Sequence, residues 1–393
     1  MPQLSRNDRF RGCMLGLATG DALGAPLEGL SAPQIRAHYG LVDQFVDGHR
    51  AWKKKPYRWR MPGLYTDDTQ QALALVEVLL DCGKIEGERL AELYIALANP
   101  KGAYIGAHRG VGRSFRQVLN DLEHGVDPIR AGQLSAGIGA AMRIAPLALH
   151  FHNDRAAMFD SMMTASLMTH RDIRSLSGAS AVLHTIRRIV LGEERDASLL
   201  LWIASDVAKD EDLIIREFAG VTSIAEHGHA MSRAIAHVES ILDLPRERAL
   251  AMLVEEANRH GAEPVCKRPT MGFPPACIPT CLYLMMTTDS FEDALIDVVN
   301  MGGDADSAGA ILGAFAGAYF GVNEIPDRWL AQLQNRQGID VRARALARQS
   351  REGLVIPDFV RTEHWLSELE ATCRENLLAM SGNGGDLGAN RLL

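Results

Sequence analysis

The segment 304–321, DADSAGAILGAFAGAYFG, constrains the fold more than any other part of the sequence. After its first four residues it consists almost entirely of Ala, Gly and large apolar side chains. A helix formed here has almost no polar face, so it has to be buried. Its small residues allow a neighbouring helix to approach closely. The sequence therefore predicts a buried helix that begins beside two carboxylates, Asp304 and Asp306.

Most of the remaining chain also has helical spacing. In 172–191 the apolar residues recur at intervals of three and four, which marks one face of a helix, whereas the alternation typical of strands is scarce. Similar spacing predicts helices over 66–80, 90–98, 142–149, 231–242, 249–257, 291–299 and 331–347. We expect an all-α fold of a dozen or more helices.

Local signals for helix ends agree with this pattern. Expected N-caps are Asp154, Asp172 and Ser290, and glycines expected to end helices are Gly192, Gly261 and Gly321. No linker divides the chain, so residues 1–380 are predicted to form one domain. The segment 381–393 is Gly-rich and polar, and we expect it to be a flexible tail.

Composition excludes several classes of protein. The chain has 41 Lys and Arg against 49 Asp and Glu, a net charge of −8, which disfavours non-specific nucleic-acid binding. No apolar run is long enough to span a membrane, and the N-terminus lacks the apolar stretch of a secretory signal. Six cysteines in 393 residues do not form a disulfide framework. We expect a cytoplasmic protein without a membrane or nucleic-acid partner.

The first acidic motif is Thr66-Asp67-Asp68, directly before an expected helix. Adjacent carboxylates repel each other, and packing them beside an apolar helix raises their pKa or requires a cation. Carboxylate and hydroxyl oxygens suit Mg²⁺ or Mn²⁺ better than Zn²⁺. Helix capping is the competing interpretation, because Thr and Asp favour first-turn positions. The motif alone favours capping.

The second acidic motif repeats this set of oxygens in Asp304, Asp306 and Ser307. Two carboxylates at the start of a buried helix are costly unless a metal or another cation compensates them. Capping in a Gly-rich turn is a weaker explanation here, because the helix that follows is not a surface helix. Together the two motifs supply four carboxylates and two hydroxyls, enough for two divalent ions and bound water.

A third stretch, GLATGDALGAPLEG, carries Asp21 and Glu28 around a Gly- and Pro-containing turn. Glu28 could reach a metal-bound water as a base or act as a gate. The competing interpretation makes Asp21 a capping or supporting carboxylate and Glu28 a surface residue of the turn.

These blocks resemble the ADP-ribosylglycohydrolase family. The resemblance rests on GDALGAPLEG, YTDDTQ and GGDADSAGAILGAFAGAYFG, and on RGVGRSFRQVL, AAMRIAPLAL and SLMTHRD between them. They occur in the family's order over about residues 10–321. The resemblance implies an all-α fold with two divalent ions, Mg²⁺ or Mn²⁺, at the bottom of a cleft.

By position in these motifs, the resemblance also implies roles for individual residues. The implied metal ligands are Thr66, Asp67, Asp68, Asp304, Asp306 and Ser307. Glu28 and Asp304 would be catalytic, and Asp21 would support the ligands. The implied substrate-binding residues are Gly110, Gly112, Ser135, Gly137, Gly139 and His170. Ser307 stands where the family more often has Thr, which keeps the hydroxyl.

The loop expected to bind the diphosphate departs from the family pattern. Family members often carry Asn before the glycine, whereas this chain has Ile138, preceded by Ala136 and Gly137. Backbone N–H groups of such a loop can still bind phosphate. Arg171 also follows His170 where a small residue is usual. Substrate identity is therefore less constrained than the metal site.

Segment 49–60, HRAWKKKPYRWR, is basic with interleaved aromatic residues. Alone it is compatible with nucleic-acid binding, and beside the first motif it could overhang the cleft and contact phosphate, adenine or an acidic target. A solvated loop is the ordinary explanation for a run of charges.

Three functions are compatible with these residues. The first is a Mg²⁺- or Mn²⁺-dependent hydrolase that removes ADP-ribose from modified protein side chains, of the arginine type. The second is a catalytically silent ADP-ribose-binding or crystallin-like structural protein on the same fold. The third is a hydrolase of another N-riboside. Retention of all six implied ligands favours an enzyme, and the altered loop keeps the second function open.

Overall fold

The computed structural model describes residues 4–98, 106–222 and 227–382. In these ranges the regular structure consists of α-helices and short 3-10 turns, without strands, which confirms the expected all-α class. In chain order the helices are α1 (Arg6–Gly24), α2 (Ala32–Tyr39), α3 (Asp67–Cys82), α4 (Gly87–Leu97), α5 (Arg113–Glu123), α6 (Pro128–Ala131), α7 (Ala145–His150), α8 (Arg155–Leu167), α9 (Ile173–Val190), α10 (Ala197–Glu217), α11 (Ala230–Glu239), α12 (Arg246–Arg259), α13 (Pro274–Thr287), α14 (Phe291–Asn300), α15 (Ala305–Phe320), α16 (Asp327–Gln332), α17 (Arg336–Arg348) and α18 (Phe359–Gly382).

The predicted helix ends are largely confirmed. The side chains of Asp154, Asp172 and Ser290 each accept a hydrogen bond from a backbone N–H in the first turn of the helix that follows. The predicted tail lies outside the described residues except for 381–382, which continue α18. No described helix is both long enough and apolar enough to cross a membrane.

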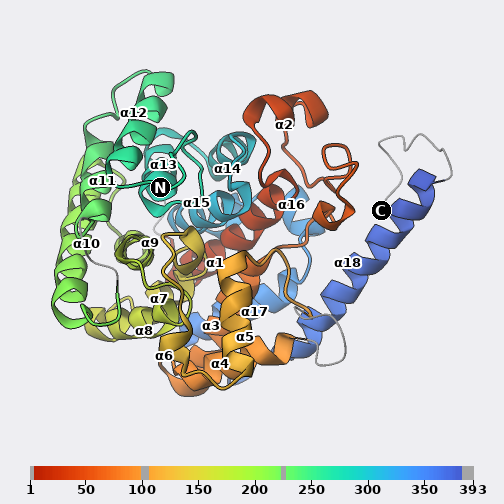
Figure 1. Ribbon diagram of the computed structural model, residues 1–393, viewed down its shortest axis with the longest axis horizontal. Helices are drawn as coiled ribbons and strands as arrows, with labels where there is room; N and C mark the ends of the chain where they lie inside the picture. The colour runs from red at the N-terminus through yellow and green to blue at the C-terminus, as the bar shows by residue number, and fades with distance from the viewer. Residues whose placement is uncertain (1–3, 99–105, 223–226, 383–393) are drawn as a thin grey trace.

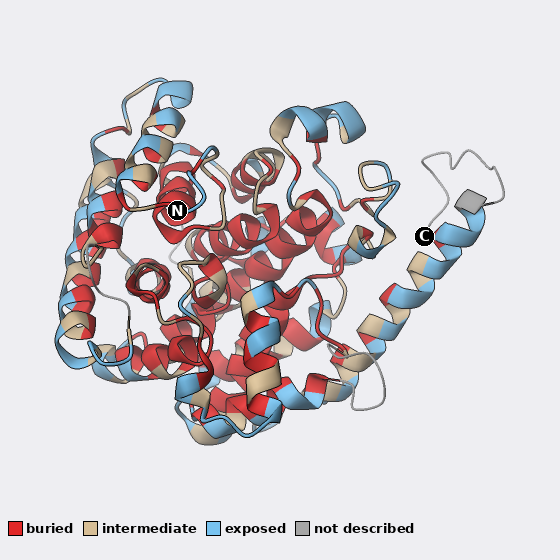
Figure 2. Ribbon diagram, viewed as in Figure 1, coloured by how far each residue is buried: buried red, intermediate tan, exposed pale blue. Residues whose placement is uncertain are grey.

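Helices α1 and α15 pack against each other at the centre of the molecule (Figures 1 and 2). They run antiparallel, and their backbones touch through glycines spaced four residues apart. The contacting pairs are Gly12 with Gly317, Gly16 with Gly313, Gly20 with Gly309, and Gly24 with Ala305. The buried helix predicted from the sequence is therefore confirmed, and its close partner is the N-terminal helix.

Gly16→Ala tests this contact. A Cβ atom at Gly16 would lie 2.2 Å from the backbone oxygen of Gly313, so the two helices would have to separate. We expect the free energy of unfolding to fall by about 1–3 kcal/mol, despite the better helix propensity of Ala. Gly220→Ala is the matched control, because no atom lies within 4 Å of that Cβ position. Equal urea midpoints for the two variants would contradict the close packing.

The same helix pair brings two distant turns together. The turn after α1 and the turn before α15 exchange backbone hydrogen bonds, from the Gly29 N–H to the Gly303 oxygen (2.7 Å) and from the Gly303 N–H to the Leu30 oxygen (2.8 Å). The backbone next to Glu28 is therefore hydrogen-bonded to the backbone next to Asp304.

The single helix expected over 331–347 is wrong, because the structure forms α16 and α17 with a break between them. Asn335 adopts a left-handed backbone conformation with φ 55°. The break has tertiary partners: the Gln334 N–H donates to the Gly63 oxygen (2.9 Å), and the Asn335 side chain donates to the Tyr65 hydroxyl (2.9 Å). These contacts with the chain before the first acidic motif stabilise a conformation that the apolar spacing does not reveal.

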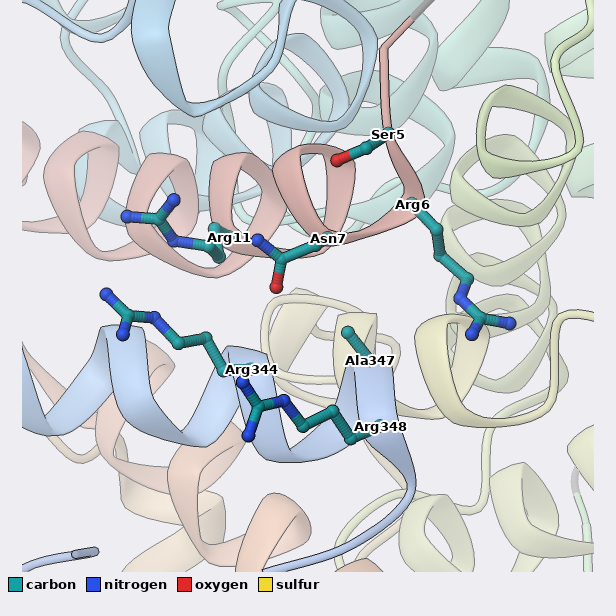
Figure 3. Close-up of a pocket in the computed structure, with 7 residues that line it drawn as sticks. All are labelled: Ser5, Arg6, Asn7, Arg11, Arg344, Ala347 and Arg348. Atoms are coloured by element: carbon teal, nitrogen blue, oxygen red, sulfur yellow. The ribbon is translucent and has the colours of Figure 1, made fainter. Parts of the chain in front are cut away.

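A cavity of about 540 Å³ opens between the first turn of α1 and the last turns of α17 (Figure 3). Its lining includes four arginines: Arg6, Arg11, Arg344 and Arg348. Asp340 forms ion pairs with Arg11 (2.6 Å) and Arg344 (2.5 Å). The length of α1 separates this cavity from Asp21 by roughly 20 Å, so it is not part of the site formed by the acidic motifs.

Candidate functional site

Asp21 organises the start of α3. Its buried carboxylate accepts hydrogen bonds from the backbone N–H and the hydroxyl of Thr66 (both 2.9 Å). It also accepts bonds from the N–H (3.0 Å) and hydroxyl (2.6 Å) of Thr69. All four bonds lead to one helix start, so Asp21 supports the first motif and has little capacity left for an ion. This arrangement matches the supporting position expected for it.

Helix capping does not explain the side chains of the two motifs. Thr66 and Asp304 occupy the N-cap positions of α3 and α15, yet neither side chain makes a capping hydrogen bond. The Thr66 hydroxyl lies 2.9 Å from an oxygen of Asp21 and 3.1 Å from Asp68 Oδ2 instead. The preference for capping drawn from the first motif alone is therefore wrong.

The two motifs lie together although more than 230 residues separate them in the sequence. Burial and the charge of Asp21 raise the pKa of Asp67 to about 8. Burial and the charges of neighbouring acids, including Asp304, raise the pKa of Asp68 well above its ordinary value. Burial and the charges of Glu28, Asp304 and Asp68 raise the pKa of Asp306 in the same way. Helices α3 and α15, which begin at the two motifs, are in contact, so these charge effects act between neighbouring carboxylates.

Two carboxylate oxygens of the acidic motifs are buried without a partner among the residues that the structure describes. Asp68 Oδ1 and Asp306 Oδ1 are buried and accept no hydrogen bond within the described residues. Unpartnered buried carboxylate oxygens are costly, and a hard divalent cation is the partner that suits them. In the described ranges, no three Asp, Glu, His or Cys side chains form a preformed ion cage. The carboxylate and hydroxyl oxygens of the two motifs are the kind of donors that suit Mg²⁺ or Mn²⁺.

The remaining implied ligands lie at the same place. Ser307 is buried and lowers the pKa of Asp68 by hydrogen bonding, opposite to the larger effect of burial. Asp304 is half-buried, and burial raises its pKa to about 6. Glu28 is partly exposed at the edge of the cluster and raises the pKa of Asp67 and Asp306. The structure therefore brings together all six implied ligands and both implied catalytic residues.

His170 and the glycine loop form the next part of the site. Gly139 packs directly against the imidazole, since a Cβ there would lie 2.7 Å from Cε1 of His170. Burial lowers the pKa of His170 to about 3, so the ring is neutral near pH 7. The Ser135 hydroxyl accepts from the Gly137 N–H (3.3 Å), and the N–H of Ile138 donates to the Gly272 oxygen (3.1 Å). Two N–H groups of the expected phosphate loop therefore already have partners.

The two implied glycines before α5 differ in position. Gly110 lies against the first motif, because a Cβ there would fall 2.8 Å from Asp67 Oδ1. Gly112 is the exposed N-cap of α5, with no atom within 4 Å of its Cβ position. The structure joins Gly110 to the acidic cluster and does not show Gly112 in contact with it.

Sequence reasoning missed Arg143, which links the first motif to His170. Its buried guanidinium donates to Gln71, and to the Thr169 hydroxyl at 2.5 Å. Gln71 in turn donates to Asp67 Oδ2 (3.2 Å), and Thr169 lies 2.9 Å from the His170 ring. Its position inside the apolar run MRIAPLAL could have predicted a buried arginine with polar partners, because a buried charge has to be paired.

Glu363 and Gly272 were also missed. Glu363 of α18 is fully buried and accepts hydrogen bonds from the Tyr65 hydroxyl (2.6 Å), Gln70 (3.0 Å) and Arg109 (2.5 Å). Tyr65 directly precedes the first motif, so its hydrogen bond to Glu363 connects α18 to the start of that motif. A Cβ at Gly272 would lie 2.2 Å from Asp304 Oδ2. Neither residue belongs to a distinctive local pattern.

Glu211 is a buried acid outside this cluster, and it makes stability depend on pH. Burial raises its pKa from 4.5 to about 7, while N–H groups of Met231 and Ser232 and nearby His229 oppose that shift. The unfolded state loses this proton at lower pH than the folded state, so stability falls as pH rises from about 4.5 to about 7. Glu211→Gln should remove the fall and gain about 2 kcal/mol relative to wild type between pH 5 and pH 8.

Urea unfolding at the two pH values measures this difference. Glu239→Gln on the exposed surface of α11 is the control and should leave the pH dependence unchanged. A constant offset between Glu211→Gln and wild type at both pH values would contradict the assignment.

Comparison with known proteins identifies relatives along nearly the whole chain. A protein of Archaeoglobus fulgidus without an assigned function is 32% identical, covering 85% of this chain and 94% of its own length. The ADP-ribosyl-[dinitrogen reductase] glycohydrolase of Rhodospirillum rubrum is 28% identical, covering 89% and 98%. A solved structure described as an ADP-ribosylglycohydrolase-related protein complex aligns with a TM-score of 0.62 at 27% identity, covering 88% of this chain and 99% of that chain.

The sequence model of the ADP-ribosylglycohydrolase family matches residues 2–354, which include both acidic motifs, the glycine loop and His170. The match ends before α18, although Glu363 of that helix accepts hydrogen bonds from Tyr65 and Gln70, on either side of the first motif. The all-α fold, the convergence of the acidic motifs and the similarity over the whole site agree. The chain belongs to the ADP-ribosylglycohydrolase family and is a hydrolase of that family.

Proposed function

We propose that this protein uses two divalent ions, Mg²⁺ or Mn²⁺, to hydrolyse the glycosidic bond of ADP-ribose conjugates on modified proteins. The observation that carries the proposal is the convergence of Asp68 and Asp306, each with a buried oxygen that no described group satisfies. A relative named for acting on ADP-ribosylated dinitrogen reductase supports a protein conjugate as the substrate.

Six oxygen-bearing side chains would hold the ions: Thr66, Asp67, Asp68, Asp304, Asp306 and Ser307. When bound, the ions would fix ribose hydroxyls and lower the pKa of a bound water. Asp304 or Glu28 would hold the proton exchanged with the water or the leaving group, since both lie at the outer side of the cluster. Asp21 and the Gln71–Arg143 pair would keep the first motif in place.

The proposed diphosphate position is the loop 135–139 beside His170. Gly139 packs directly against the neutral imidazole, and Gly272 connects the loop to Asp304. Because the Gly137 and Ile138 N–H groups are already bonded, fewer backbone donors are available here for phosphate. With fewer donors for a diphosphate, a hydrolase of another N-riboside remains the alternative enzyme function.

We propose arginine as the side chain that carries the ADP-ribose in the substrate. Its guanidinium group is cationic near neutral pH in the conjugate, and the guanidine that leaves becomes cationic again when it takes up a proton. Glu28 and Asp304 surround the outer side of the cluster with negative charge, which favours a cationic leaving group over the neutral hydroxyl of serine.

Hydrolysis assays test the proposal. Purified protein is supplied with ADP-ribosyl-arginine protein, ADP-ribosyl-serine peptide and a second N-riboside, each with Mg²⁺, Mn²⁺ or EDTA. We expect release of ADP-ribose from the arginine conjugate with metal and its loss with EDTA. Binding of ADP-ribose without turnover of any conjugate would instead support a silent binding protein, and metal-independent turnover would remove the two-ion mechanism.

A further inference from the structure

The backbone at Glu28 is fixed, while its side chain is not enclosed. The neighbouring Gly29 and Leu30 are hydrogen-bonded to Gly303, which ties the turn to the second acidic motif. The Glu28 side chain is 35% exposed and makes no hydrogen bond to the acidic cluster that would fix its rotamer. Its orientation therefore depends on whatever contacts it from the outer side.

Arg58 makes that contact. Its Nη1 donates to the Glu28 backbone oxygen (3.0 Å) and lies 3.6 Å from the carboxylate oxygen Oε2. The guanidinium stacks 4.7 Å above the Trp52 ring, and the Trp52 indole N–H donates to the Pro26 oxygen (3.1 Å). Trp52 and Arg58 thus hold the turn at two points, two residues apart. Segment 49–60 is not a loose solvated loop at these residues.

The charges around Glu28 explain why its ion pair with Arg58 influences the rotamer of the Glu28 side chain. On the inner side, Glu28 interacts repulsively with Asp67, Asp304 and Asp306. On the outer side, Arg58 is the oppositely charged group in ion-pair contact with it. An ion pair this exposed stabilises the fold very little. Its larger effect is on which rotamer Glu28 adopts beside the cluster.

We propose that Arg58, held by stacking on Trp52, is a positioning residue that keeps the Glu28 carboxylate at the mouth of the acidic site. The inference rests on the proposed function, in which Glu28 exchanges a proton with water or the leaving group. Arg58 acts through Glu28 and does not itself bind the ADP-ribose. Arg58 therefore contributes to turnover and not to affinity.

A kinetic double-mutant cycle tests this role. Arg58→Ala should lower kcat about tenfold, because a misplaced acid is a poor proton-transfer group. KM and the Kd for ADP-ribose measured by calorimetry should stay within about twofold of wild type. Arg58→Lys should recover part of kcat, since an ammonium can still pair with Glu28. In the Glu28→Ala background, Arg58→Ala should have no further effect on kcat.

Lys54→Ala is the matched control, because it removes one exposed positive charge from the same segment. It should leave kcat and KM unchanged. A rise in KM or Kd in Arg58→Ala, persisting in the Glu28→Ala background, would overturn the inference by making Arg58 a substrate-binding residue. Wild-type kcat in Arg58→Ala would overturn it as well. Both outcomes leave the proposed function intact, whereas absence of turnover by wild type would overturn the proposed function and this inference with it.

Discussion

Asp67→Asn and Asp304→Asn should each lower hydrolysis of ADP-ribose conjugates by about 10³-fold or more. Asn keeps the shape of the side chain but removes the negative charge that would hold a divalent ion. At Asp304 it also removes a group able to take up a proton. The two residues come from α3 and from the turn before α15, so equal losses would show that both motifs serve one site.

Both variants should remain folded. Each replaces one carboxylate of a mutually repelling cluster with a neutral amide, and Gln71 can still donate to the amide oxygen at position 67. Thermal unfolding followed by circular dichroism separates loss of activity from loss of structure. Asp289→Asn, at an exposed position, is the control and should keep full activity. Full activity in either site variant would remove the two-ion mechanism.

Glu363→Ala should lower the free energy of unfolding by about 3–5 kcal/mol, because it leaves the buried Arg109 guanidinium without its carboxylate. The loss extends beyond this ion pair. The Tyr65 hydroxyl and the Gln70 amide also lose the acceptor they share. Urea unfolding at pH 7 measures the change, and Glu368→Ala on the exposed side of α18 should stay within about 0.5 kcal/mol of wild type.

The same variant tests whether α18 supports the site. Tyr65 directly precedes Thr66, so loosening it should also reduce turnover at temperatures where the variant is still folded. The double variant Arg109→Ala with Glu363→Ala should be less destabilised than the sum of the single variants, because neither charge is then left alone. Additive losses would show that the buried ion pair contributes nothing specific.

Several features could be predicted from local sequence because local physics decides them. The N-caps Asp154, Asp172 and Ser290 bond to N–H groups two or three residues away. The burial of α15 follows from the lack of a polar face. The expected helix over 331–347 was wrong because its break is stabilised by Gly63 and Tyr65, which lie far away in the sequence.

The residues of the site also fall into those that local sequence predicts and those that depend on distant contacts. Thr66, Asp67, Asp68, Asp304, Asp306 and Ser307 could be named from short motifs, since clustered carboxylates on apolar helices require compensation. Arg143, Glu363 and Arg58 act through partners on other helices or turns. Their roles depend on distances that no local spacing encodes.

The sequence by itself determined the class of fold, the buried α15 helix and the chemical identity of the acidic groups, because composition and periodicity act within a few turns of helix. Only the tertiary structure decided that α1 is the helix packed against α15, and that Thr66 and Thr69 at the start of α3 are the partners of Asp21. It also decided that Arg58 and Glu363 contact the site from outside its motifs. The physical reason is that hydrogen bonds and charge interactions depend on separation in space, and packing of the helices sets that separation.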